Sequence, residues 1–283
     1  MRDIGLDSWQ ATEKTESYAV EQSNLEGTDR WRTTEKSVIK GGQVALRRCW
    51  SSLFFTECFV GGFMRKYTKT EAVRIVTECA AKYKTQLLGK NLLFIAADKH
   101  KKTSAMEVLF EKRNFMHLTG LKINKTTLSA DRFFEMCVSR RLSEKDFEMA
   151  ADGTTDLKLA VLSIMMNKNL SANSIGDYNS SGLELYTEKL AGSVKGCMGF
   201  IQDKLTKELV PNTVLNKDIR LCTRIPQMRI LMTCRKPQTD VEYTEIVYMA
   251  KKVTWSQISF PEAYTYLMDR IDDYNNTKRG MER

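Results

Sequence analysis

The chain contains two histidines, and only one of them lies among side chains that could carry out chemistry together. His117 lies between Phe115 and Thr119, and if this segment is extended the three side chains project from one face. An imidazole and a hydroxyl would then lie beside an aromatic ring, and histidine exchanges protons near neutral pH. The sequence thus predicts either a general acid–base residue or a half-buried histidine hydrogen-bonded to Thr119 or to the backbone. The other histidine, His100, lies in a charged turn and is predicted to be exposed without a catalytic role.

A second group of polar side chains lies later in the chain, between residues 176 and 189. On a strand over 183–189, Tyr186 and Glu188 would face one way and Thr187 and Lys189 the other. A lysine next to a threonine can hold a phosphate oxygen through charge and hydrogen bonds. The alternative is the solvated end of an ordinary strand.

Positive charge is concentrated beyond residue 63, where several basic residues flank these two segments. The net charge is +9, with 8 basic and 9 acidic residues in the first 63 and 36 basic and 26 acidic residues after them. This balance favours an anionic partner, nucleic acid first and a membrane surface second, although a merely solvated surface is equally compatible. The residues that could contact RNA, by charge or by stacking on bases, are Arg113, Phe115, Lys122, Tyr178, Tyr186 and Lys195, with Lys125 and Lys204 nearby.

The motifs predict no metal or other cofactor. The seven cysteines include no Cys-x-x-Cys pair, and neither Gly-x-Gly-x-x-Gly nor a phosphate-loop pattern occurs. A magnesium nuclease would need converging carboxylates, which Asp152, Asp156 and Asp177 could supply, although their spacing does not require it. The polar N-terminal residues and the lack of an apolar run of about 20 residues predict a cytoplasmic protein with reduced thiols and no membrane partner.

The expected elements begin with a helix and then change period. Thr68 and Glu71 form a capping box, and Ile75, Cys79 and Tyr83 follow at helical spacing. Apolar runs predict a β-hairpin at 91–97 and 105–111, helices at 130–141 and 156–167, strands at 171–177, 183–189, 194–202, 213–219, 228–234 and 243–250, and a last helix at 267–274. Helices followed by a run of strands indicate an α+β fold with an antiparallel sheet.

The chain is predicted to divide at two places. Residues 1–63 lack a regular apolar pattern and are interpreted as a poorly ordered or non-native extension, or else as a small helical module that buries 44–63. Residues 64–224 would form the main domain, and residues 225–283 would add a C-terminal strand and helix.

A series of short segments in a fixed order carries a resemblance to a known family. The segments are Phe115-Met-His-Leu-Thr-Gly-Leu-Lys122, Ser129-Ala-Asp-Arg-Phe-Phe, Leu142-Ser143, Asp152-Gly-Thr-Thr, Ile175-Gly-Asp-Tyr-Asn179, Leu185-Tyr-Thr-Glu-Lys-Leu-Ala-Gly192 and Val210-Pro-Asn-Thr213. Over residues 66–220 the chain resembles the phage and mobile-element branch of the barnase–EndoU–colicin–RelE-like (BECR) nucleases.

The resemblance implies a compact α+β domain, helices first and antiparallel sheet after, that cleaves RNA without a metal. The ribose 2′-OH would attack its own phosphate and leave a 2′,3′-cyclic phosphate. His117 would be the base or acid, Thr119 would bind phosphate or position His117, Lys189 would stabilise transition-state charge, and Tyr186 would stack or donate. Since no second histidine joins His117, a two-histidine mechanism is not expected.

The function predicted from this resemblance is that of an endoribonuclease of a phage or mobile element, acting as a toxin or a processing enzyme. RNA would be its partner, and a toxin would also need an immunity protein or antitoxin. Two alternatives stay open. One is a non-catalytic nucleic-acid-binding or interaction protein with the same fold, and the other is a nuclease directed at DNA.

Overall fold

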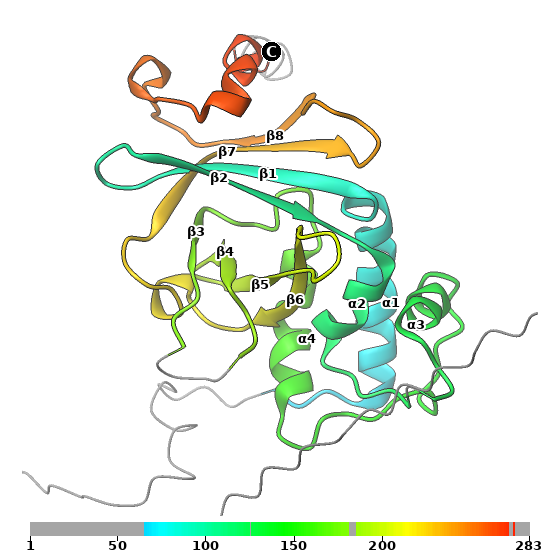
Figure 1. The fold of residues 1–283 in the computed structure, drawn as a ribbon. Helices are drawn as coiled ribbons and strands as arrows, with labels where there is room; N and C mark the ends of the chain where they lie inside the picture. The colour runs from blue at the N-terminus through cyan, green and yellow to red at the C-terminus, as the bar shows by residue number, and fades with distance from the viewer. Residues whose placement is uncertain (1–64, 125, 181–184, 272–273, 275–283) are drawn as a thin grey trace, which may run out of the picture. The chain divides into compact units, whose positions relative to one another are not determined.

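Residues 65–124, 126–180, 185–271 and 274 are described by the computed structural model of the chain (Figure 1). The predicted extension over 1–63 lies outside them. In chain order the helices and strands are α1 (Lys69–Gln86), β1 (Lys90–Ala97), β2 (Thr103–Leu109), α2 (Lys112–Thr119), α3 (Ala130–Val138), α4 (Thr154–Met165), β3 (Ser174–Asp177), β4 (Lys189–Ser193), β5 (Gly196–Gln202), β6 (Leu209–Leu215), β7 (Met228–Pro237) and β8 (Glu245–Met249). Short 3-10 helices lie at η1 (Ile219–Leu221), η2 (Trp255–Gln257) and η3 (Glu262–Leu267).

Helix α1 begins where its sequence predicts. The Thr68 hydroxyl accepts a hydrogen bond from the Glu71 backbone N–H at 3.1 Å, and the Glu71 carboxylate accepts one from the Thr68 N–H at 2.9 Å. This reciprocal pair satisfies two backbone donors that would otherwise lack partners. The helix buries Val76, Cys79 and Tyr83, whereas the predicted Ile75 is only partly buried against the same core. The capping box is therefore confirmed, and the predicted apolar face is confirmed at Cys79 and Tyr83.

The eight strands of the described residues form one sheet that curls into a ring (Figure 1). Their order is β1-β2-β6-β5-β4-β3-β7-β8, and β7 closes the ring because it also pairs with β1. All pairings are antiparallel except that of β2 with β6, which consists of one residue pair, Val108 with Leu209. The predicted α+β fold with a mainly antiparallel sheet is therefore confirmed. Strand β7, which lies beyond residue 224, belongs to the same sheet as β1 and β3.

Helices α1 to α4 share one core with one face of the sheet. Two separate apolar clusters, one with the C-terminal residues and one with η1, lie on the opposite face. On β1, Phe94 points into the core with the helices, while Leu93 and Ile95 point the other way. The C-terminal residues Phe260, Leu267 and Ile271 pack on that second face. Strand β1 reads as an unbroken apolar run because both of its faces are buried.

The extended segment predicted around His117 is wrong, since residues Lys112–Thr119 form helix α2. Two local features explain the difference. The Asn114 side chain accepts a hydrogen bond from the Glu111 backbone N–H at 3.1 Å, which fixes the helix start, and Gly120 ends the helix in a left-handed conformation with φ of 71°. In a helix, the residues at 115, 116, 118 and 119 share the buried face and leave His117 exposed.

Three further predicted elements have shifted bounds. Strand β4 begins only at Lys189, because residues 185–188 run irregularly; the Glu188 backbone still bonds Tyr178 and Phe200. Residues 181–184 lie outside the described ranges. Strand β6 covers 209–215 and not 213–219, since Asp218 caps η1 by accepting the Arg220 N–H. The last helix was predicted over 267–274, but η3 occupies residues up to Leu267. Within the described residues, only 269–271 and Tyr274 are helical there.

Two glycines with left-handed backbones allow a matched test of how α2 meets α4. Gly120 (φ +71°) lies so close to α4 that a Cβ would be 3.1 Å from Thr155 Cα and 2.9 Å from Lys158 Cδ, whereas a Cβ at Gly89 (φ +68°) would touch nothing. We expect Gly89→Ala to lower the free energy of unfolding by about 1–2 kcal/mol through backbone strain alone. Gly120→Ala should lose about 1–3 kcal/mol more through crowding. Urea titrations of both variants provide the comparison, and equal losses would contradict the described contact.

Candidate functional site

The first candidate site is the exposed side of α2, which we call the α2 surface and define by Arg113, His117 and Lys158. Arg113 and His117 are both exposed and lie one helical turn apart, so they share one side of α2. Lys158, on the neighbouring helix α4, donates a hydrogen bond through Nζ to the backbone oxygen of His117 at 2.7 Å. The fold thereby brings an imidazole-bearing residue and an amine together from two helices.

Lys158 is the residue of this surface that the sequence reasoning missed. Its side chain is half-buried against α2, and burial lowers the pKa of its amine to about 8. An amine with such a pKa can give up and take back a proton much closer to neutral pH than an ordinary lysine can. The only signal in the sequence is its place in the helical period, since Lys158 lies one turn before the buried Leu162.

The charge of Arg113 is partly neutralised by ion pairs within the fold. Its guanidinium forms ion pairs with Glu111 at 2.6 Å and with Asp203 at 3.0 Å, and the hydrogen bond to Glu111 is the main reason why its pKa is raised. Backbone N–H groups of Thr206 and Leu205 bond the Asp203 carboxylate and, with Arg113, keep its pKa below the usual value. Arg113 therefore ties the start of α2 to the loop between β5 and β6.

Two residues predicted to lie beside His117 are instead in the core. Thr119 is fully buried, and its hydroxyl donates to the Met116 backbone oxygen at 2.8 Å and accepts from the Leu121 N–H at 3.1 Å. The Phe115 ring is fully buried among Tyr83, Phe133 and Phe134. In this conformation neither side chain can reach a nucleic acid, because a helix turns both of them away from His117.

The second candidate site is the segment from Tyr186 to Lys189, together with its neighbours on β3 and β6. Tyr186 is 76% exposed, and the Thr187 hydroxyl hydrogen-bonds the Asn212 side chain at 3.1 Å. Lys189 forms an ion pair with Asp177 at 2.5 Å, so its charge is partly neutralised. The predicted phosphate-binding lysine is thus accessible but already paired.

The two candidate sites lie on different faces of the sheet. Met198 and Phe200 of β5 belong to the core that α2 joins, whereas Cys197 belongs to a separate cluster with Leu190. Thr187 packs over Gly199, whose Cβ position alternates with Met198 and Phe200 and so lies on the second face. The fold therefore does not bring His117 and Thr187 to one place, although α2 packs against β6 and Thr187 hydrogen-bonds Asn212 of the same strand.

The remaining predicted residues are distributed over separate elements. Lys122 and Lys195 are exposed, whereas Tyr178 is buried beside η1, and burial raises its pKa. His100 is exposed in the turn between β1 and β2, as predicted. Within the described ranges, no three His, Cys, Asp or Glu side chains are grouped so that they could hold a metal ion. Among the same residues, no helix combines the length and apolarity needed to cross a bilayer.

Lys158 provides a pH-dependent test of the α2 surface. Its pKa is about 8 when folded and near 10.5 when unfolded, so between these values the unfolded chain binds more protons and stability rises with pH. Lys158→Met removes this contribution. We measure the free energy of unfolding of the parent and of Lys158→Met by urea titration from about pH 7.5 to 10.5. We expect the value for the parent to increase relative to the value for the variant as the pH rises. A difference that does not change with pH would contradict the burial of this amine.

Comparison with protein families gives one match, which covers more than half of the chain. Residues 75–252 match the family described as phage-Barnase-EndoU-ColicinE5/D-RelE like nuclease4. Comparison with curated proteins and with solved structures gave no match. The matched range begins within α1 and ends just beyond β8, so it includes helices α2 to α4, the closed sheet and both candidate sites. The chain therefore belongs to the barnase–EndoU–colicin–RelE-like nucleases.

Proposed function

We propose that this nuclease is a metal-independent endoribonuclease that uses the ribose 2′-OH as its nucleophile. The supporting observation is the α2 surface. His117 is exposed on α2, and the Lys158 amine lies 2.7 Å from the backbone oxygen of the same residue. The amine thus lies at the turn of α2 that carries His117, and both side chains belong to types that can exchange protons near neutral pH here, as a cleavage with a base and an acid requires.

In the proposed reaction His117 is the base. It takes the 2′-OH proton while O2′ bonds to phosphorus, and the bond between phosphorus and O5′ breaks. Lys158, released from the His117 carbonyl, gives its proton to the departing O5′. The products are a 2′,3′-cyclic phosphate and a free 5′-OH. Arg113, one turn earlier, would offset the charge that develops on the phosphoryl oxygens once its own ion pairs open.

The other predicted residues have revised roles in this proposal. Tyr186 and Lys189 would bind RNA, Tyr186 by stacking on a base and Lys189 by exchanging Asp177 for a phosphate. Lys122 and Lys195 would add positive charge along the RNA. Thr119 and Phe115 would act only through the core, where they hold α2 in place.

A role as a toxin of a phage or mobile element, restrained in the cytoplasm by an immunity protein or antitoxin, is the physiological part of the proposal. The supporting observation is that the family description contains the word phage and names ColicinE5/D and RelE. Arrest of bacterial growth on expression of the parent, but not of His117→Ala, would support a toxin. Normal growth with a shortened RNA species would instead support a processing enzyme.

Cleavage of a defined RNA by the full chain in excess EDTA tests the chemistry. We expect fragments that end in a 2′,3′-cyclic phosphate, and no cleavage of the same oligonucleotide with 2′-deoxyribose at every position, because that substrate lacks the nucleophile. Cleavage of the deoxy oligonucleotide would overturn the mechanism in favour of a DNA-directed nuclease. Binding of RNA without cleavage would favour the non-catalytic alternative.

A further inference from the structure

The turn of the β1–β2 hairpin lies at one end of the sheet (Figure 1), and positive charge gathers around it. Strand β7 begins beside this turn, because Arg229 is in register with Ala97, the last residue of β1. The turn after β8 lies there too, since the Arg229 guanidinium donates to the Lys251 backbone oxygen at 2.9 Å. Six exposed cations from these three segments form what we call the hairpin surface: Lys99, Lys101, Lys102, Arg229, Lys251 and Lys252.

The cations of the hairpin surface are not neutralised by the fold. Among the described residues, no carboxylate forms an ion pair with any of the six. Asp98, the carboxylate of the hairpin turn, instead accepts hydrogen bonds from the backbone N–H groups of His100 and Lys102 at 2.8 and 2.9 Å. Lys189 and Arg113 of the two candidate sites, by contrast, already pair with carboxylates. A phosphate can therefore bind at the hairpin surface without displacing an internal partner.

Two of these lysines have backbone conformations that lysine rarely adopts. Lys101 has a φ of 64° and Lys252 a φ of 60°, so both are left-handed. Glycine takes this conformation without steric cost, whereas a side chain makes it unfavourable. Residues held in such conformations cluster at functional sites. Lysine at both turns is explained if its charge serves a ligand.

The hairpin surface lies near the second candidate site along strand β3. This strand is in register with Arg229 at one end and with Lys189 at the other, so the two positions are about 10 Å apart along it. Ile230 packs in the core with the helices, so its neighbour Arg229 points to the opposite face of the sheet, where Thr187 also lies. A strand of RNA bound at the second candidate site is therefore within reach of the hairpin surface.

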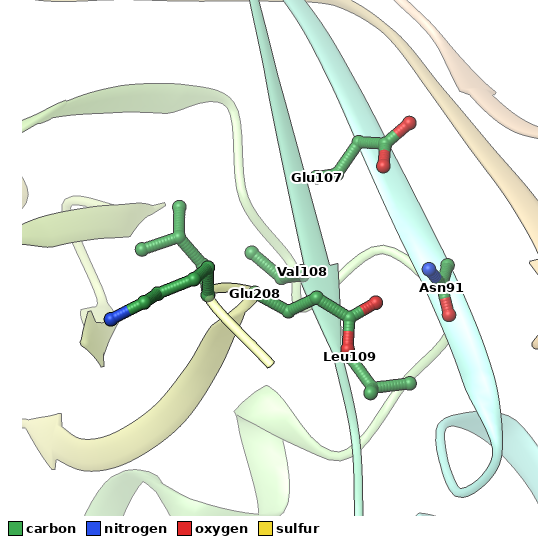
Figure 2. Close-up of a pocket in the computed structure, with 7 residues that line it drawn as sticks. Asn91, Glu107, Val108, Leu109 and Glu208 are labelled. Atoms are coloured by element: carbon green, nitrogen blue, oxygen red, sulfur yellow. The ribbon is translucent and has the colours of Figure 1, made fainter. Parts of the chain in front are cut away.

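The pocket between β2 and β6 provides a contrasting environment. It has a volume of about 210 Å³, and Glu107 and Glu208 are among its lining residues (Figure 2). Their carboxylates would repel a phosphate. Lys207 lies in the same lining and is exposed, with a left-handed φ of 63°. It therefore matches Lys101 and Lys252 in residue type and backbone conformation but lies beside carboxylates, which makes it a control.

We propose that the hairpin surface binds the phosphate backbone of the RNA substrate without reading its sequence. This inference rests on the proposed function, because it takes RNA as the ligand. Lysine and arginine donate charge-assisted hydrogen bonds to phosphate oxygens, and the counterions released from RNA make such binding depend on salt. An anionic membrane fits less well, because the three segments expose no large apolar side chain that could enter a bilayer.

The test measures how tightly the full chain binds a fluorescent oligoribonucleotide that is methylated at every 2′-OH and so cannot be cleaved by the proposed chemistry. Fluorescence anisotropy gives the affinity in EDTA from about 50 to 200 mM salt. The double variant Lys101→Gly with Lys252→Gly should bind about fivefold more weakly. Its plot of log affinity against log salt should be shallower by about 1.4, which corresponds to two phosphate contacts of a single strand.

A stability measurement separates a role in binding from a role in folding. The double variant should have a higher urea midpoint than the parent, because glycine relieves the strain at both turns. Lower affinity together with higher stability cannot result from misfolding. Lys207→Gly should also raise the urea midpoint, but it should bind the oligonucleotide with the affinity and salt dependence of the parent.

Three results would overturn the proposal. The first is parent-like affinity and salt dependence in the double variant. The second is an equal loss in Lys207→Gly, which would reveal a general effect of charge. The third is that vesicles of equal parts phosphatidylserine and phosphatidylcholine bind the parent but not the double variant, while RNA binds both alike. A parent that binds RNA through this surface but does not cleave the unmethylated form would support the inference while contradicting the proposed chemistry.

Discussion

Replacing His117 with alanine should lower the rate of RNA cleavage by about 100- to 10,000-fold, the range usual for loss of a positioned general acid or base. The imidazole is exposed on α2, so its removal should leave the fold intact. The measurement is the single-turnover cleavage rate of a labelled RNA in excess EDTA, with circular dichroism to confirm that the variant is folded.

The chain provides its own control for this experiment. His100 is the only other histidine, and it is also exposed, in the turn between β1 and β2. His100→Ala should therefore cleave at the parent rate. If His117→Ala cleaves normally, or if both variants lose activity equally, His117 is not the proton-transfer group. The segment from Tyr186 to Lys189 would then become the candidate active site.

Replacing Phe115 with alanine should lower the free energy of unfolding by about 3–5 kcal/mol, the usual loss for a large aromatic removed from a core. Its ring is fully buried and contacts the rings of Tyr83 at 5.2 Å, Phe134 at 5.3 Å and Phe133 at 6.5 Å between centroids. It therefore joins α2 to both α1 and α3. Unfolding in guanidinium chloride, followed by far-UV circular dichroism, measures the loss in free energy of unfolding.

Tyr186→Ala is the matched comparison, because Tyr186 is an aromatic residue that is 76% exposed. Its free energy of unfolding should change by less than about 0.5 kcal/mol, while its RNA affinity should fall by an amount that corresponds to about 1–3 kcal/mol for one stacked base. If Phe115→Ala proves stable but binds RNA poorly, the ring is a stacking residue after all and the described core is wrong there.

The parts of the fold that could be predicted are those fixed by neighbours in the sequence. The capping box of Thr68 and Glu71 needs only four residues, and the hairpin of β1 and β2 needs only two apolar runs and a charged turn. Both are as expected. The closure of the ring by β1 and β7 could not be predicted, because it pairs strands from opposite ends of the described chain.

The segment around His117 shows why local patterns fail over short stretches. Six residues fit either a period of two or a period of 3.6, and the outcome depends on how the ends are capped and which neighbours bury the apolar side chains. Asn114 and Gly120 settle the ends, and α1 and α3 supply the neighbours. His117 is exposed and not half-buried, whereas Thr119 and Phe115 are buried and cannot act beside it. Lys158 could be found only once α2 and α4 were placed side by side.

The pairing of β1 with β7 also bears on how this nuclease is made. During synthesis, β1 leaves the ribosome long before β7, and until then one edge of β1 has no strand to pair with, because β2 occupies only the other. Contacts between distant segments form late and slowly. A nascent chain that has not yet reached Met228 therefore holds every residue of the α2 surface without the closed sheet that supports it. In this fold, closure of the sheet is tied to synthesis of the chain as far as β7.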